Sequence, residues 1–106
     1  MLFVTRDTKT ITIPPFIKKI ASYAFSETLI TSIEIPSNVT HICEGAFSFC
    51  KYLEHVKIPK NSSLQKIGYS AFADTKIESL VFPSNLSVLE DGWCDETKSL
   101  INIEII

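Results

Sequence analysis

Apolar residues recur along this chain in a fixed order, with a period of 22 to 24 residues. Each repeat contains a branched or aromatic residue followed by proline, and these pairs are Ile13-Pro14, Ile35-Pro36, Ile58-Pro59 and Phe82-Pro83. A repeat this short cannot bury its own apolar face, whereas stacked repeats bury a continuous core. The pattern therefore predicts a solenoid.

When the repeats are aligned on their prolines, about eight columns are apolar. An alanine followed by phenylalanine recurs as Ala24-Phe25, Ala46-Phe47 and Ala71-Phe72. A chain of 106 residues is long enough for one domain with a modest core. We expect a single repeat domain over residues 1–106, with repeats at about 9–30, 31–53, 54–77 and 78–100 and a final strand at 101–106.

The segments TSIEI, EHVKI and ESLVF alternate apolar and polar residues, which is typical of short strands with one face turned inward. The proline that follows each strand cannot donate to a ladder, so it ends the strand. We predict five parallel strands in one sheet, near residues 10–13, 32–35, 55–58, 79–82 and 102–105. The stretch 38–42 is a candidate for a second short strand, and each alanine–phenylalanine segment for a single turn or short helix.

The unit IPSNVTHICEGAFSFCKYLEHVKIP, from Ile35 to Pro59, resembles the leucine-rich repeat of the BspA type, and the resemblance covers residues 9–106. It implies a horseshoe-like α/β leucine-rich-repeat solenoid, with a short parallel β-sheet on one face and turns and short helical segments on the other. It also implies a surface or secreted adhesin that binds host extracellular-matrix proteins. The fourth repeat departs from the pattern, because Gly92-Trp93-Cys94 stands where the family has an alanine–phenylalanine pair.

Composition and charge narrow the list of partners. The formal net charge is −2 and no run of lysine and arginine is present, which argues against nucleic acid. The longest apolar run is only a few residues, so we expect no membrane span. The opening MLFVTRDTKT does not have the pattern of a signal peptide. A cytosolic protein, a fragment and export by another route all fit this observation, whereas the family resemblance implies the cell surface or secretion.

Two histidines and two cysteines lie close together in the stretch HICEGAFSFCKYLEH, at His41, Cys43, Cys50 and His55. Zinc sites use four converging ligands, usually in short pairs such as C-x2-C, and this spacing has no such pair. The four residues also fall in four different columns of the repeat. We therefore expect structural or surface roles for them, with no metal, no cofactor and no catalysis. The chain has three cysteines, an odd number that favours reduced thiols.

The outward strand positions form a row across the predicted sheet. Exposed sheet faces are the usual recognition surfaces of solenoids. The residues that we assign to this binding face are Ser32, Glu34, His55, Lys57, Ser79, Val81, Asn102 and Glu104. A solvated face without a partner explains the same small, mixed side chains about equally well.

Two aromatic residues of the second repeat are further candidates for contacts with a partner. Phe49 stands where the other repeats have an acidic residue, and Tyr52 follows three positions later. Packing against a neighbouring coil is the alternative for such rings. Trp93 occupies the alanine column, where we expect it to fill space left by Cys94.

Three N-x-S/T motifs begin at Asn38, Asn61 and Asn85, each two residues after a strand-ending proline. In a secreted eukaryotic protein they would be glycosylation sites. A turn feature that recurs with the repeat explains them without modification, since asparagine after proline is favoured turn chemistry.

We expect the chain to be a non-catalytic protein-binding module that resembles an adhesin. The alternative is a structural segment of a longer repeat array with no activity of its own. The last segment, INIEII, would leave an unpaired apolar edge, so self-association through the end strands is a further expectation.

Overall fold

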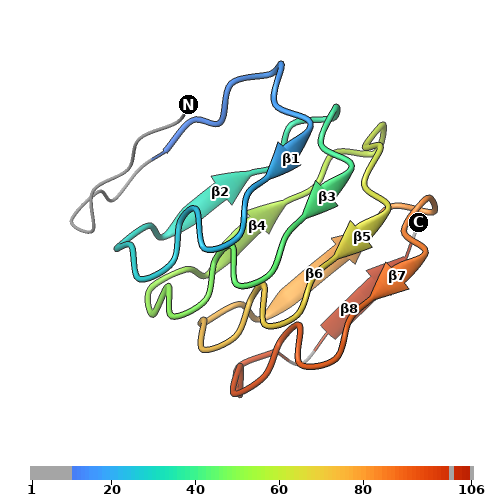
Figure 1. Ribbon diagram of the computed structural model, residues 1–106. Helices are drawn as coiled ribbons and strands as arrows, with labels where there is room; N and C mark the ends of the chain where they lie inside the picture. Colours follow the sequence, from blue (N-terminus) through green and yellow to red (C-terminus); the bar gives the residue numbers. More distant parts are fainter. Residues whose placement is uncertain (1–10, 101, 106) are drawn as a thin grey trace.

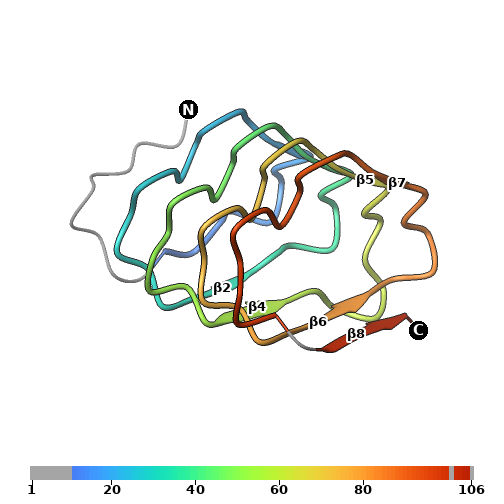
Figure 2. The ribbon, with the colours of Figure 1, turned by 90° about the horizontal axis from the view of Figure 1, so that it is seen from below.

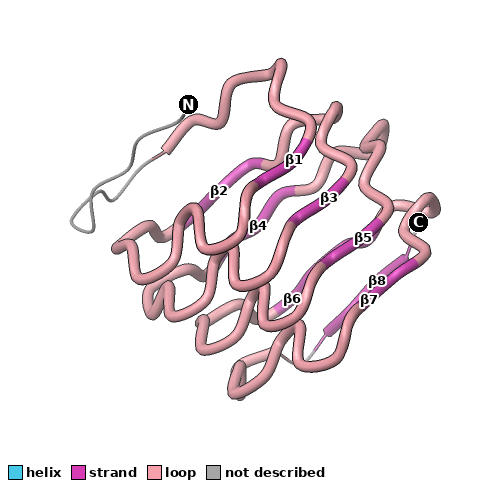
Figure 3. Tube along the Cα trace, viewed as in Figure 1, coloured by secondary structure: helices cyan, strands magenta, loops and turns pink. Residues whose placement is uncertain are grey.

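The computed structural model describes residues 11–100 and 102–105, which wind into a parallel solenoid of stacked coils (Figure 1). The described residues form eight strands and no helix. The strands are β1 (Lys19–Ile20), β2 (Ser32–Glu34), β3 (His41–Ile42), β4 (His55–Lys57), β5 (Lys66–Ile67), β6 (Ser79–Phe82), β7 (Val88–Leu89) and β8 (Asn102–Ile105). Turns and loops make up the larger part of each coil (Figure 3).

The strands form ladders on two sides of the coils. β1, β3, β5 and β7 make a four-stranded parallel sheet, while β2 pairs with β4 and β6 pairs with β8. Figure 2 shows β2, β4, β6 and β8 along one side of the solenoid and β5 and β7 on another. Each coil therefore contributes one short strand to each side.

Most of the predicted strands are confirmed. The strands expected near 32–35, 55–58, 79–82 and 102–105 are β2, β4, β6 and β8, and the second short strand of the 38–42 stretch is β3. The strand expected near 10–13 is wrong over residues 11–13, which have no strand conformation, and residue 10 lies outside the described residues. One continuous sheet is also wrong, because no ladder joins β4 to β6 within the described part of the chain.

The prediction of short helical segments is wrong for the described residues, where the alanine–phenylalanine segments are turns. Two columns in these turns have positive φ, which a right-handed helix excludes. The first column comprises Tyr23, Gly45, Ser70 and Gly92, and the second comprises Glu27, Phe49, Asp74 and Glu96. Alternate N–H groups donate to the next coil and not along their own segment: Phe25 N–H donates to Ala46 O (2.9 Å) and Phe47 N–H to Ala71 O (2.8 Å).

The core lies between the strand ladders and the turns. Phe25, Phe47 and Phe72 stack with ring centroids 5.3 Å apart. Beside them runs a buried column of small polar residues, namely Thr28, Cys50, Thr75 and Thr97. Trp93 packs edge-on against Phe82 with ring centroids 5.5 Å apart. This contact is consistent with a packing role for the tryptophan in the irregular last coil.

Candidate binding surface

The outward side chains of β2, β4 and β6 form one surface. In β2 the central Ile33 is buried, whereas Ser32 and Glu34 on either side are exposed. In β4, His55 and Lys57 are exposed in the same way. The register places Ser32 beside His55 and Glu34 beside Lys57. Because side chains alternate along a strand, these four residues face solvent together.

This surface is hollowed on both sides of β4. A depression of about 600 Å³ runs from residues 11–13 over β2 to His55 and Lys57. A second depression of about 250 Å³ continues from His55 and Lys57 to Ser79 and Val81 on β6. The second hollow lies where the ladder between β4 and β6 is missing. We call this continuous feature the sheet-face groove and define it by Ser32, Glu34, His55, Lys57, Ser79 and Val81.

The sheet-face groove combines an apolar floor with a rim that has charges of both signs. Ile11, Ile13 and Ile33 line its larger hollow, together with Glu34 and Lys57 at the rim. His55 lies 4.0 Å from the carboxylate of Glu54, and both side chains are exposed. The groove therefore offers hydrogen-bonding and charged groups of both signs around an apolar floor.

The remaining two predicted face residues lie on β8. Asn102 pairs with Ser79 in the ladder, and its side chain lies outside the described part of the structure. Glu104 pairs with Val81 and is exposed. The groove thus contains six of the eight residues assigned to this face from the sequence.

The four residues of the apparent metal motif lie in four environments. His41 is half-buried on β3 and lies 2.8 Å from the hydroxyl of Thr40. His55 is exposed on β4, Cys43 is half-buried, and Cys50 is fully buried in the polar column of the core. Within residues 11–100 and 102–105, no three histidine, cysteine or acidic side chains are grouped as metal ligands.

Cys50 has a structural role. Its thiol donates to the carbonyl oxygen of Phe25 at 3.0 Å and lies 3.4 Å from the hydroxyl of Thr28. Burial raises the pKa of the Cys50 thiol, and hydrogen bonding to Thr28 opposes that shift in part. The side chain is therefore a neutral, hydrogen-bonded member of the core, as Thr28 and Thr75 are in the equivalent positions.

Phe49 and Tyr52 border a separate shallow pocket of about 360 Å³, whose other walls include Leu29 and Lys51. The two aromatic side chains are 50 % and 51 % exposed. The ammonium group of Lys76 lies 5.7 Å from the centre of the Tyr52 ring, a cation–π distance. Tyr52 thus has a cation–π partner within the protein, while the two rings are about equally exposed.

Sequence reasoning did not single out Tyr23 and Tyr69, which are 54 % and 52 % exposed on the turns. The Tyr23 hydroxyl donates a hydrogen bond of 2.7 Å to the carboxylate of Glu44. This hydrogen bond, followed by loss of solvation and by the charges of Glu44 and Tyr69, raises the pKa of the Tyr23 phenol. The two tyrosines occupy different columns of the repeat, so the alignment gave no signal for them.

The three N-x-S/T asparagines are exposed at the turns that follow the prolines. Asn38 donates its side-chain amide to the carbonyl of Pro15 at 3.1 Å, and Asn85 donates to that of Ser62 at 3.2 Å. These bonds tie each turn to the preceding coil and give both asparagines a structural role. Glycosylation at Asn38, Asn61 and Asn85 stays a prediction.

Among the described residues, no helix has the length and hydropathy needed to cross a bilayer.

No curated protein matches the chain.

Two crystal structures share the fold. The pneumococcal vaccine antigen PcpA is 28 % identical with a TM-score of 0.82, over 85 % of this chain and 22 % of that protein. A leucine-rich repeat protein from Bacteroides capillosus is 26 % identical with a TM-score of 0.73, over 85 % of this chain and 64 % of that one. The chain therefore spans less than two thirds of either protein.

The repeat pattern itself is matched by a family model. The BspA type leucine rich repeat region matches residues 2–101, which include all the strands described above except β8. The parallel coils, the order of buried columns that recurs from coil to coil and this match agree. The chain belongs to the BspA-type leucine-rich repeat family.

Proposed function

We propose that the chain is a non-catalytic protein-binding module of adhesin-like character, which contacts a host or extracellular-matrix protein through the sheet-face groove. Leucine-rich repeat modules bind proteins, and modules of this family are typically non-catalytic. The similarity to the vaccine antigen PcpA supports a surface role. Cell-surface or secreted localisation is part of the same proposal.

The groove is the single observation that carries the proposal. Its two hollows meet at His55 and Lys57 on β4, so a partner lying across the strands would contact both residues at once. Exposed sheet faces supply binding surfaces in solenoids. Here, the smaller hollow lies at the break between β4 and β6, and specificity would come from Glu34, His55 and Lys57 on the rim.

The test is binding of the purified chain to immobilised extracellular-matrix proteins, measured by surface plasmon resonance. We expect Lys57→Ala and Glu34→Ala each to raise the Kd about five- to thirtyfold, as for side chains that contribute about 1–2 kcal/mol at an interface. Lys60→Ala is the matched control, since Lys60 is an exposed lysine on the turn after β4 and outside the groove. Equal effects of Lys57→Ala and Lys60→Ala would contradict the proposal.

A second function, that of a structural segment in a longer repeat array, is favoured by the last described coil. Leu89 is 43 % exposed and Ile105 is 71 % exposed, whereas their counterparts in the preceding coil, Ile67 and Phe82, are 0 % and 1 % exposed. A further coil or a second copy of the chain would bury these side chains. This function would replace the first if the unaltered chain bound none of the immobilised proteins.

A further inference from the structure

A row of tyrosines and carboxylates runs across the turns, away from the sheet-face groove. It consists of Tyr23, Glu44, Tyr69 and Asp91, one residue from each successive coil. Backbone hydrogen bonds hold neighbouring turns together: Tyr23 N–H donates to Glu44 O (2.9 Å) and Gly45 N–H donates to Tyr69 O (2.8 Å). At a ladder spacing of about 4.8 Å, aromatic and acidic side chains alternate along this row.

The Tyr23 ring is held in place by its neighbours. A Cβ atom at Gly45 would clash with a Tyr23 ring carbon, so the ring occupies the space that this glycine leaves open. The phenol is fixed at its far end by the 2.7 Å hydrogen bond to Glu44. Tyr69 reaches toward Gly92 in the next coil, where a Cβ would lie 3.5 Å from its ring. A ring that is fixed in advance, as that of Tyr23 is, loses little conformational entropy on binding.

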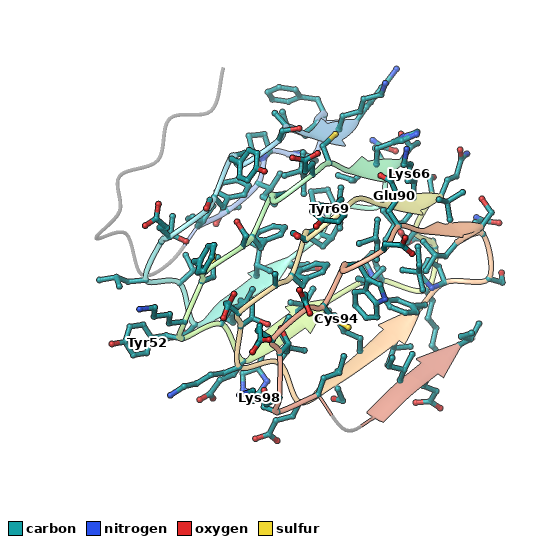
Figure 4. The ribbon with its side chains drawn as sticks, turned by 60° about the horizontal axis from the view of Figure 1, so that its bottom comes forward. Tyr52, Lys66, Tyr69, Glu90, Cys94 and Lys98 are labelled. Carbon is teal, nitrogen blue, oxygen red and sulfur yellow. The ribbon has the colours of Figure 1, made fainter. Side chains whose placement is uncertain are left out.

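The charge on the row is not balanced within the described protein. The turns at 22–27, 44–49, 69–74 and 91–96 contain no lysine, arginine or histidine. Two nearby acidic residues outside the row do have cationic partners. Lys66 lies 3.5 Å from Glu90 (Figure 4), and Lys98 lies 3.8 Å from Glu96. Glu44 and Asp91 form no ion pair with any cation among the described residues.

From this arrangement we infer that the row Tyr23–Glu44–Tyr69–Asp91 is a second docking surface, which binds a lysine- or arginine-bearing segment of a protein partner. Cations are attracted to the faces of aromatic rings and to carboxylates, and here the two groups alternate within reach of one extended segment. Arginine fits best because its planar guanidinium both stacks on tyrosine and donates to carboxylates. The surface is separate from the sheet-face groove and does not depend on the function proposed for that groove.

The test uses a fluorescently labelled peptide of alternating arginine and serine, with a citrulline-for-arginine peptide as its uncharged counterpart. Fluorescence anisotropy at low ionic strength should show tighter binding of the arginine peptide. Tyr69→Ala should raise its Kd about two- to fivefold, the size expected for one exposed cation–π contact. Tyr69→Phe should keep the affinity, and Glu44→Gln should raise the Kd and reduce its dependence on salt.

Tyr52→Ala is the matched control, because Tyr52 is as exposed as Tyr69 but lies well apart from it in Figure 4. We expect it to leave the Kd unchanged, and Lys57→Ala in the groove likewise. Two results would overturn the proposal: equal affinity for the arginine and citrulline peptides, or equal losses in Tyr52→Ala and Tyr69→Ala. If Tyr69→Ala does not fold, the Kd of Glu44→Gln for the arginine peptide tests the proposal in its place. Neither result bears on matrix-protein binding at the groove, so the two proposals fail independently.

Discussion

At the scale of single residues, the turns depend on glycines, which have no side chain, at particular positions. Gly45 has a φ of 61°, and the ring of Tyr23 from the preceding coil occupies the position of its missing Cβ. Gly92 shares the left-handed backbone, with a φ of 68°, but its nearest neighbour lies 3.5 Å from the Cβ position. Alanine substitutions at the two glycines therefore distinguish the energy of backbone strain, present at both, from the energy of steric crowding, present only at Gly45.

We expect Gly45→Ala to lower the free energy of unfolding by about 2–4 kcal/mol, since strain at positive φ and overpacking against Tyr23 add together. Gly92→Ala should lower it by about 1 kcal/mol, the backbone contribution alone. The free energy of unfolding is measured by urea denaturation of both variants and of Gly45→Ala in a Tyr23→Ala background. Equal losses in the two alanine variants, or no relief in the double variant, would show that the ring does not crowd Gly45.

At the scale of elements, the turns explain why a helix was expected and not found. The segments around Ala46-Phe47 have residues that suit a helical turn, and most of their left-handed positions are occupied by residues other than glycine. Apart from Gly45 and Gly92, the sequence of each segment therefore gave little indication of left-handed turns in place of a helix. The backbone is set by hydrogen bonds between coils, such as that from Phe49 N–H to Ala73 O (2.9 Å), which a single segment does not reveal.

Residues other than glycine that adopt the left-handed conformation should lower the free energy of unfolding by a measurable amount. Ser70 has a φ of 55° in the column that also contains Gly45 and Gly92. We expect Ser70→Gly to raise the free energy of unfolding by up to about 1 kcal/mol. Ser79→Gly, on strand β6, should lower it by about 0.5–1 kcal/mol, because glycine weakens a strand. Thermal and urea unfolding compare the two, and a loss in both variants would argue against strain at Ser70.

At the scale of the whole molecule, the repeating apolar columns predicted the stacked coils, the parallel strands and the outward face. The columns specify which side chains are buried, and the stacking follows from burial. They did not predict the hollows of the sheet-face groove. β2 pairs with β4, and β6 with β8, at a separation of 23 residues, but His55 and Ser79 are 24 residues apart and their strands form no ladder.

That added residue is visible in the sequence, yet spacing alone does not determine whether a turn absorbs it or the ladder breaks. The tyrosine–carboxylate row was missed for a different reason. Tyr23 and Tyr69 lie in different columns, and the cross-coil contacts of Tyr23 with Gly45 and Glu44 become evident only once the coils are stacked.

We propose that the chain binds a protein partner across β2, β4 and β6. The most direct measurement is the change in backbone amide NMR shifts of the isotope-labelled chain on titration with a matrix protein selected in the immobilised binding assay. We expect the largest changes at residues 32–34, 55–57 and 79–81, around the sheet-face groove. Changes confined to the turns at 22–27, 44–49, 69–74 and 91–96, with none on the three strands, would contradict it.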